Sequence, residues 1–156
     1  AIFHDGNLLP GDAFRCGEAG HMTLIPDGKP CYCGKTGCVD AYCSARLLSD
    51  LSGGRLEDFF LGLQQNNPDY RSVWDTYLKH LAVVINNLHM LLDYDIVLGG
   101  YVGSFLTPWL DTIRHLVAER NTFEDDGSFV KLCTYQTGAA AYGAAMDVME
   151  EFLRTV

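Results

Sequence analysis

The sequence predicts an α/β domain, and three observations support this fold class. In the second half of the chain, helical segments alternate with short apolar segments typical of strands, which is the pattern of helices layered on a sheet. With 156 residues, the chain is long enough to bury one hydrophobic core. Apolar residues make up 48% and charged residues 20%, so the composition is that of a globular protein rather than a disordered one.

The first quarter of the chain is expected to form short strands joined by turns. Asp5-Gly6-Asn7 is a hairpin signal between two short apolar segments. Pro26-Asp27-Gly28 is a turn that closes a further strand. The three strands are expected at residues 1–4, 8–9 and 22–25, and a cysteine-rich loop follows over about 29–38.

The remainder of the chain is expected to be mainly helical. A first helix runs from Val39 to the break at Ser52-Gly53-Gly54. The longest helix starts near Pro68, and its apolar residues recur at steps of three and four. These residues are Val73, Tyr77, Leu81, Val84, Leu88 and Leu91. Further helices are expected at 56–63, after Thr107-Pro108 and over 138–153, with a buried strand at 95–98 and another strand at 129–134.

Charge and hydropathy exclude several classes of protein. Eleven basic and twenty acidic residues give a net charge of −9, which disfavours contact with nucleic-acid phosphates. The longest apolar candidate, 81–92, is interrupted by Asn86, Asn87 and His89 and is shorter than the roughly 18 residues that span a bilayer. The opening residues lack the pattern of a signal peptide, so we expect a cytoplasmic protein. Because the chain starts with Ala1 inside a strand-like segment, we expect a fragment of a longer protein, the alternative being removal of an initiator Met.

Five of the six cysteines lie within the first 43 residues. Disulfides are typical of secreted proteins with small cores, and neither property is expected here. Cys31 and Cys33 are too close in sequence for a relaxed disulfide, whereas both thiolates can turn onto one ion. With His21 and Cys38 they make the one-His, three-Cys set typical of structural zinc, with free thiols as the alternative. The other cysteines, expected to be small buried residues, are Cys16, Cys43 and Cys133.

Two joined motifs carry a family resemblance. Glu18-Ala19-Gly20-His21, followed by the segment from Cys31 to Asp40, CYCGKTGCVD, resembles the signature of the ROK family of bacterial sugar kinases and sugar-responsive repressors. That signature reads E-x-G-H, then C-x-C-G-x-x-G-C-x-E. The resemblance covers essentially the whole chain and implies the C-terminal lobe of an actin/hexokinase-like, ribonuclease H-like fold. It implies one sugar-binding lobe over 1–156, with a structural zinc loop at about 21–38.

The resemblance also implies the roles of individual residues. The residues that match the zinc ligands are His21, Cys31, Cys33 and Cys38. Glu18 and His21 match residues that bind sugar hydroxyls, so one nitrogen of His21 would bind zinc and the other would face the sugar. Asp40 stands where the family usually has Glu, a further sugar-contacting carboxylate. Because Asp is one methylene shorter, its contact is lost, bridged by water or suited to a different sugar. Without the resemblance, Glu18 would be interpreted as a solvated surface carboxylate, and Asp40 as a carboxylate at the N-terminus of a helix.

Two functions remain open. In ROK kinases, the catalytic Asp and the phosphate-binding motifs precede E-x-G-H. In ROK repressors, the helix-turn-helix that binds DNA also precedes it. This chain alone is therefore expected neither to phosphorylate sugars nor to bind DNA. We expect the effector domain of a ROK transcriptional regulator that senses a hexose, N-acetylhexosamine or derivative; the alternative is the C-terminal lobe of a ROK sugar kinase. Two residues favour the regulator. One is Asp40, which replaces the usual Glu. The other is Tyr101, which directly follows Gly99-Gly100, where a nucleotide needs a small residue.

The resemblance further implies a homodimer or higher homo-oligomer. Proteins that this chain resembles assemble into dimers or tetramers through this half. Paired DNA half-sites also require a regulator with two-fold symmetry. The last predicted helix has a face of small residues that allows another element to approach closely, at Ala140, Gly143 and Ala144. The alternative is that this face packs within the same lobe.

Overall fold

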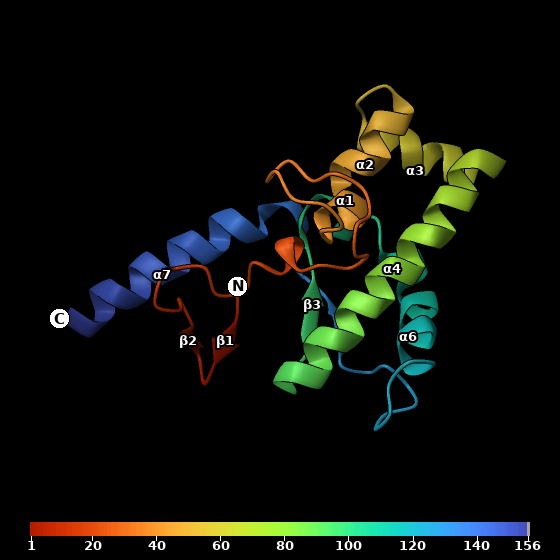
Figure 1. Ribbon diagram of the computed structural model, residues 1–156. Helices are drawn as coiled ribbons and strands as arrows, with labels where there is room; N and C mark the ends of the chain where they lie inside the picture. The colour runs from red at the N-terminus through yellow and green to blue at the C-terminus, as the bar shows by residue number, and fades with distance from the viewer. Residues whose placement is uncertain (156) are drawn as a thin grey trace.

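The computed structural model describes residues 1–155, and the side chains of all of these except 150, 151 and 154 (Figure 1). Its strands are β1 (Phe3–His4), β2 (Asn7–Leu8), β3 (Ile96–Leu98) and β4 (Val130–Leu132). Its α-helices are α1 (Asp40–Cys43), α2 (Ala45–Ser49), α3 (Leu56–Gln64), α4 (Pro68–Leu92), α5 (Gly100–Gly103), α6 (Leu110–Ala118) and α7 (Ala139–Thr155). Short 3-10 turns are η1 (Ala19–His21), η2 (Asp50–Ser52), η3 (Thr107–Trp109) and η4 (Gln136–Gly138).

The β3 and β4 strands pair in parallel, with Ile96 opposite Val130 and Leu98 opposite Leu132. The chain passes through α6 between them, as a parallel pair requires, and the predicted α/β class is confirmed. The expectation of a buried strand at 95–98 is wrong, because Val97 is exposed and Ile96 and Leu98 are only partly buried. Successive side chains of a strand point to opposite faces, and only the face of Ile96 and Leu98 is partly covered.

The hydrophobic core lies where α4 packs against α3 and α6. Its largest fully buried side chains are Leu48, Phe59, Trp74, Leu78, Ile85, Ile113, Val117 and Val130. Rings make much of this core: Trp74 stacks on Tyr77 with ring centroids 5.1 Å apart, and Phe60 stacks on Phe105 at 4.2 Å. Aromatic pairs add directional attraction to the apolar area that they bury, so this cluster fixes how the helices sit.

The predicted start of α4 at Pro68 is confirmed. Asn67 caps the helix by accepting hydrogen bonds from the backbone N–H groups of Asp69 and Tyr70. The apolar face is rotated from the expected one: Leu91 is 76% exposed, whereas His89 is buried. His89 stacks on Phe129 at 3.5 Å between ring centroids, and its Nδ1 lies 2.8 Å from the carbonyl oxygen of Tyr94. These partners allow a polar ring to replace an aliphatic one.

The predicted helix from Val39 is interrupted. Ser44 is extended, with ψ at 155°, and its hydroxyl accepts a hydrogen bond from the N–H of Leu47 at 3.3 Å. Serine is a good N-cap because its side chain satisfies a donor at the start of a helix. The segment therefore forms two short helices, and the change of direction at Ser44 places α1 against α4 and α2 against α3.

The N-terminal hairpin is confirmed, whereas the strand expected at 22–25 is not. Phe3 pairs with Leu8, and Asp5 and Gly6 make the turn with positive φ angles of 49° and 75°. Of the third expected strand, only an isolated antiparallel bridge between Thr23 and Cys38 is present. This segment lies alongside the cysteine loop instead of entering a sheet.

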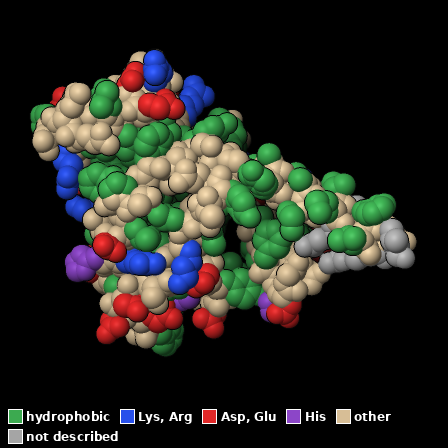
Figure 2. All heavy atoms as spheres, turned by 180° about the vertical axis from the view of Figure 1, so that it is seen from behind, with side chains coloured by type: hydrophobic (Ala, Val, Ile, Leu, Met, Phe, Trp, Pro, Cys, Tyr) green, Lys and Arg blue, Asp and Glu red, His purple; other side chains and the backbone are tan. Residues whose placement is uncertain are grey.

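Helix α7 projects away from the core, beside the N-terminal hairpin (Figure 1). Residues 140–149 are all exposed, so the small-residue face does not pack within the described lobe. The helix also exposes large apolar side chains, and Figure 2 shows hydrophobic groups along this projecting arm. They include Tyr142, Met146, Met149, Phe152 and Leu153. Within the described residues, no helix combines the length and the apolar character needed to cross a membrane.

Candidate functional site

The predicted metal-ligand set comes together in space. The candidate ligand atoms of His21, Cys31, Cys33 and Cys38 all lie within 4.8 Å of one another. His21 is the last residue of η1, and the three cysteines come from the loop that follows. Cys31 and Cys38 are buried, whereas His21 and Cys33 are exposed, so the cluster lies at the protein surface with one side accessible.

Backbone hydrogen bonds hold the cysteine loop in shape. The N–H of Cys31 donates to the carbonyl of Lys35 at 2.8 Å, and the N–H of Gly34 donates to the carbonyl of Cys31 at 3.0 Å. The N–H groups of Leu24 and Ile25 both donate to the carbonyl of Gly37. The loop is therefore a narrow hairpin laid against the 22–25 segment, which returns Cys38 to the side of Cys31.

Gly37 is required by this close approach. Its φ is +79°, a conformation that L-residues adopt at a cost, and a Cβ at this position would lie 1.9 Å from the carbonyl oxygen of Ile25. Gly34 also has a positive φ, of +84°, but a Cβ there would meet nothing within 4 Å. Of these two glycines, Gly37 is thus the one whose missing side chain lets the hairpin close.

The spacing of the thiols fits a tetrahedral zinc ion. The Sγ atoms of Cys33 and Cys38 lie 3.7 Å apart, too far for the ~2.05 Å bond of a disulfide. Two thiolates at about 2.3 Å from one tetrahedral ion would lie about 3.8 Å apart. One imidazole and three thiolates form the closed ligand set of structural zinc sites, so the residues present fit the predicted metal.

The thiols differ in their environment. Burial, together with the neighbouring sulfur atoms of Cys33 and Cys31, raises the pKa of the Cys38 thiol to about 11. A backbone hydrogen bond at Lys35 lowers the pKa of the Cys33 thiol. Without a metal, Cys38 is therefore protonated at neutral pH. A cation is needed to stabilise its thiolate, which is how a zinc ion binds cysteine.

Two of the three predicted sugar-binding residues meet beside the metal cluster, at the side chain of Tyr32. The Tyr32 hydroxyl donates a hydrogen bond to Oδ2 of Asp40 at 3.1 Å, and its oxygen lies 3.3 Å from Nε2 of His21. Asp40 opens α1, and its Oδ1 lies 2.6 Å from the point where a Cβ on Gly20 would stand. Gly20 therefore leaves the space that the Asp40 carboxylate occupies.

Glu18 precedes η1 and is exposed, and the described structure gives it no hydrogen bond through its side chain. The negative charge of Glu18 nevertheless affects the neighbouring phenol of Tyr32. The pKa of the Tyr32 phenol is raised first by the hydrogen bond to Asp40, and also by the negative charges of Asp40 and Glu18. The site is therefore an acidic, open surface next to the metal cluster.

Buried tyrosines connect this site to the core. Tyr42 in α1 accepts a hydrogen bond through its hydroxyl from the N–H of Lys29 at 2.7 Å. A Cβ at Gly28 would lie 2.1 Å from the same hydroxyl oxygen, so this contact also depends on a glycine. Tyr77 in α4 donates from its hydroxyl to the carbonyl of Cys43 at 2.8 Å. Asp40 therefore stands on a short helix whose last two residues are held in place by these contacts.

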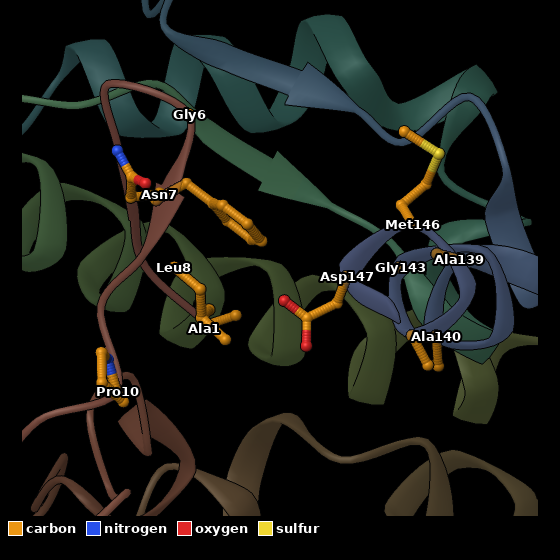
Figure 3. A pocket seen from close by; sticks show the side chains of 12 residues that line it. Ala1, Gly6, Asn7, Leu8, Pro10, Ala139, Ala140, Gly143, Met146 and Asp147 are labelled. Carbon is orange, nitrogen blue, oxygen red and sulfur yellow. The ribbon is translucent and has the colours of Figure 1, made fainter. Parts of the chain in front are cut away.

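Two cavities lie away from these residues. The larger, of about 810 Å³, separates the N-terminal hairpin from α7; it is mostly apolar, and Asp147 faces into it (Figure 3). The smaller, of about 440 Å³, lies between α2, α3 and α5. Its polar lining comes from Arg46, Ser49, Glu57, Tyr101, Ser104 and Thr137. Tyr101 is 73% exposed and forms part of the wall, so it does not fill the space after Gly99-Gly100.

Sequence reasoning missed Tyr32 as a site residue. The residue lies between two predicted ligands, Cys31 and Cys33, and an aromatic residue in a tight, exposed loop was the available signal. Its contacts with Asp40 and His21 depend on how the loop folds over η1. The cysteines outside the metal-ligand set, Cys16, Cys43 and Cys133, are partly buried and do not join the cluster.

Comparison with known proteins gives concordant matches. A family model described as the ROK family matches residues 1–151. The chain is 28% identical to a glucokinase from Halalkalibacterium halodurans, over 96% of this chain and 52% of that protein. It is 31% identical to an N-acetylmannosamine kinase from Escherichia coli, over 97% of this chain and 53% of that protein. The chain spans about half the length of these relatives.

Solved structures share the fold. A ROK hexokinase from Thermus thermophilus matches with a TM-score of 0.60 and 26% identity, over 73% of this chain and 41% of that one. A ROK family glucokinase from Streptomyces griseus, solved with glucose and AMPPNP, matches with a TM-score of 0.69 and 18% identity, over 86% of this chain and 51% of that one. These matches confirm the expected resemblance to an actin/hexokinase-like fold. Since these relatives are kinases, they favour the kinase alternative over the regulator.

Proposed function

Because the chain belongs to the ROK family, we propose that it forms the zinc-bearing, sugar-binding lobe of a sugar kinase. The chain matches about half of each related kinase. The groups that hold the nucleotide phosphates and remove the proton from the sugar hydroxyl would therefore belong to a further part of the protein. In the complete kinase, a sugar hydroxyl gives its proton to that base and takes the terminal phosphoryl group of the nucleotide.

One observation carries the proposal: a hydroxyl oxygen, that of Tyr32, already lies within 3.3 Å of both Asp40 and His21. A carboxylate that accepts and an imidazole N–H that donates form a pair suited to a sugar hydroxyl, which both donates and accepts. Glu18 supplies a further exposed carboxylate for a neighbouring hydroxyl. The substrate would be a hexose or N-acetylhexosamine, the classes that the related kinases are named for.

Zinc would act through structure in this proposal. His21, Cys31, Cys33 and Cys38 would hold it, and the bound ion would supply folding free energy and a fixed orientation for the imidazole. Since Nε2 of His21 faces Tyr32, Nδ1 is the nitrogen left for the ion. The hydrogen of the neutral ring then resides on Nε2, where it can be donated to a hydroxyl.

The smaller cavity supports the kinase reading over the regulator reading. Tyr101 was expected to oppose a nucleotide, yet its side chain lines a cavity of about 440 Å³ and leaves it open. That volume is within the usual range for small-molecule sites. We propose that the nucleoside part of the phosphoryl donor binds there. The substitution of Asp40 for Glu is the sequence argument that remains for a regulator.

Calorimetry tests the sugar site. Glucose and N-acetylmannosamine are titrated separately into the zinc-loaded protein, and into its Glu18→Ala and Asp125→Ala variants. We expect Glu18→Ala to weaken binding about tenfold or more, because a charged acceptor is lost. Asp125→Ala, an exposed carboxylate in the loop before β4, should bind like the wild type. Unchanged affinity in Glu18→Ala removes this residue from the site. In the complete protein, ADP formation from ATP and either sugar distinguishes a kinase from a regulator.

A further inference from the structure

One carboxylate oxygen of Asp40 is already hydrogen-bonded within the chain, and the other lies against Gly20. Oδ2 accepts the hydrogen bond from the Tyr32 hydroxyl at 3.1 Å. Oδ1 faces the backbone of Gly20, 2.6 Å from the point where a Cβ would stand. A sugar hydroxyl that is to use Oδ2 therefore finds it bonded to another hydroxyl.

The Tyr32 oxygen also stands where such a sugar hydroxyl would have to be. It lies 3.1 Å from Oδ2 of Asp40 and 3.3 Å from Nε2 of His21. A hydroxyl has one hydrogen to donate and can accept from an N–H, so Tyr32 makes the two bonds that a substrate hydroxyl would make. Two oxygen atoms cannot share this position, because they would overlap.

Nothing else in the described structure holds the Tyr32 side chain firmly. It is 78% exposed, and the one ring that it pairs with among the described residues is that of His21, in a T-shaped arrangement with centroids 5.3 Å apart. The loop backbone is fixed independently, by the hydrogen bonds between Cys31 and Lys35 and between Gly34 and Cys31. The ring can therefore turn away about its own side-chain torsions while the metal cluster stays in place.

We propose that Tyr32 is a specificity-determining residue whose hydroxyl occupies the sugar site when it is empty and must be displaced by the substrate. A sugar succeeds only if one of its hydroxyls replaces both bonds, to Asp40 and to His21. A sugar that lacks this hydroxyl cannot replace these two bonds, so Tyr32 keeps its place and the sugar binds more weakly, without a bond to Asp40 or His21 at this position. This inference rests on the proposed function, because it concerns the same site.

Calorimetry with a Tyr32→Phe variant tests the inference. The ring is kept and the competing hydroxyl is lost, so we expect the zinc-loaded variant to bind glucose or N-acetylmannosamine about 3- to 10-fold more tightly, the equivalent of one net hydrogen bond. The zinc content should not change. The matched control is Tyr135→Phe, another exposed tyrosine, which contacts Tyr142 and not the site; it should bind as the wild type does. Weaker or unchanged binding by Tyr32→Phe, or an equal gain in the control, overturns the inference.

The series of monodeoxyglucoses gives a second readout. The gain from Tyr32→Phe should disappear for the one derivative that lacks the competing hydroxyl, and should persist for the others. An equal gain for every derivative contradicts competition for a single position. If the wild type binds sugar and Glu18→Ala weakens it while Tyr32→Phe brings no gain, only this inference fails. If zinc-loaded wild type and Tyr32→Phe both bind neither sugar, the sugar site itself is wrong, and the inference fails with it.

Discussion

The hydroxyl of Tyr77 donates a hydrogen bond to the backbone carbonyl of Cys43 at 2.8 Å, and so ties the end of α1 to the middle of α4. Tyr77 is buried, and burial raises the pKa of its phenol well above the ordinary value, so the proton stays on the hydroxyl at any physiological pH. Asp40 opens the same short helix. The position of a candidate sugar-binding carboxylate is thus set partly from the core.

Tyr77→Phe should destabilise the protein by about 1–3 kcal/mol, because the Cys43 carbonyl loses its buried donor. Urea unfolding followed by circular dichroism measures this difference. Tyr101→Phe, at an exposed side chain, should stay within about 0.5 kcal/mol of the wild type. Equal stability of the two variants would show that the Tyr77 hydrogen bond contributes nothing.

One zinc ion per chain is expected, because the four ligand atoms already lie within 4.8 Å of one another. Cys33→Ser should lose the ion and lower the free energy of unfolding by about 3 kcal/mol or more. Elemental analysis and thermal unfolding measure both effects. Cys16→Ser, outside the cluster, should keep one zinc. A wild type without zinc, or a Cys33→Ser variant with full zinc and full stability, contradicts the assignment.

Gly37→Ala should prevent the cysteine loop from closing, because its Cβ would lie 1.9 Å from the carbonyl oxygen of Ile25. We expect a loss of about 3 kcal/mol or more in stability, together with loss of the metal. Gly34→Ala is the matched control, since it shares the positive φ but meets nothing within 4 Å. It should cost only about 1–2 kcal/mol and keep the zinc. If the two variants lose similar stability and keep or lose zinc alike, the positive φ angle, and not the contact with the Ile25 carbonyl, would account for the effect of Gly37→Ala.

Zinc affinity should rise with pH. Cys38 has a thiol pKa of about 11 in the metal-free chain, so it holds its proton below that pH and must release it to bind zinc. Protons and zinc therefore compete, and the apparent affinity should rise about tenfold per pH unit for each proton released. Competition with a chromophoric chelator, at about pH 6 and about pH 8, measures the slope. An affinity independent of pH would mean that no thiol is deprotonated on binding.

Self-association stays a prediction. The exposed apolar side chains of α7 form a surface that would gain stability from being covered. Light scattering of the protein at increasing concentration should show a dimer or a larger oligomer. A monomer at every concentration would count against this use of α7 and leave the proposed metal and sugar sites unaffected.

The metal cluster was predictable because its information is local. His21, Cys31, Cys33 and Cys38 lie within 18 residues, and the glycines at 34 and 37 indicate tight turns. The hairpin at Asp5-Gly6 and the start of α4 at Pro68 were predictable for the same reason, since turn and cap residues act on their immediate neighbours.

Features that depend on distant partners were not predictable. Leu91 fits the spacing of an apolar face, yet His89 is buried instead because Phe129 and the carbonyl of Tyr94 are brought to it by folding. Ser44 lies within a helical sequence pattern, so the pattern alone did not predict that the chain changes direction there and that Ser44 caps a new helix. The role of Tyr32 required the loop to be placed over Asp40.

The contact between Gly20 and Asp40 limits how this site can evolve. An ancestor or descendant with Glu at position 40 must find room for one more methylene, yet one side of the carboxylate is closed by the backbone of Gly20 and the other by the Tyr32 hydroxyl. Positions 20, 32 and 40 therefore form an epistatic set. A side chain larger than glycine at 20 is incompatible with the present rotamer of Asp40. A Glu at position 40 therefore requires the Tyr32 side chain to turn away or to be replaced, so its effect on the proposed sugar site would depend on the residue at position 32.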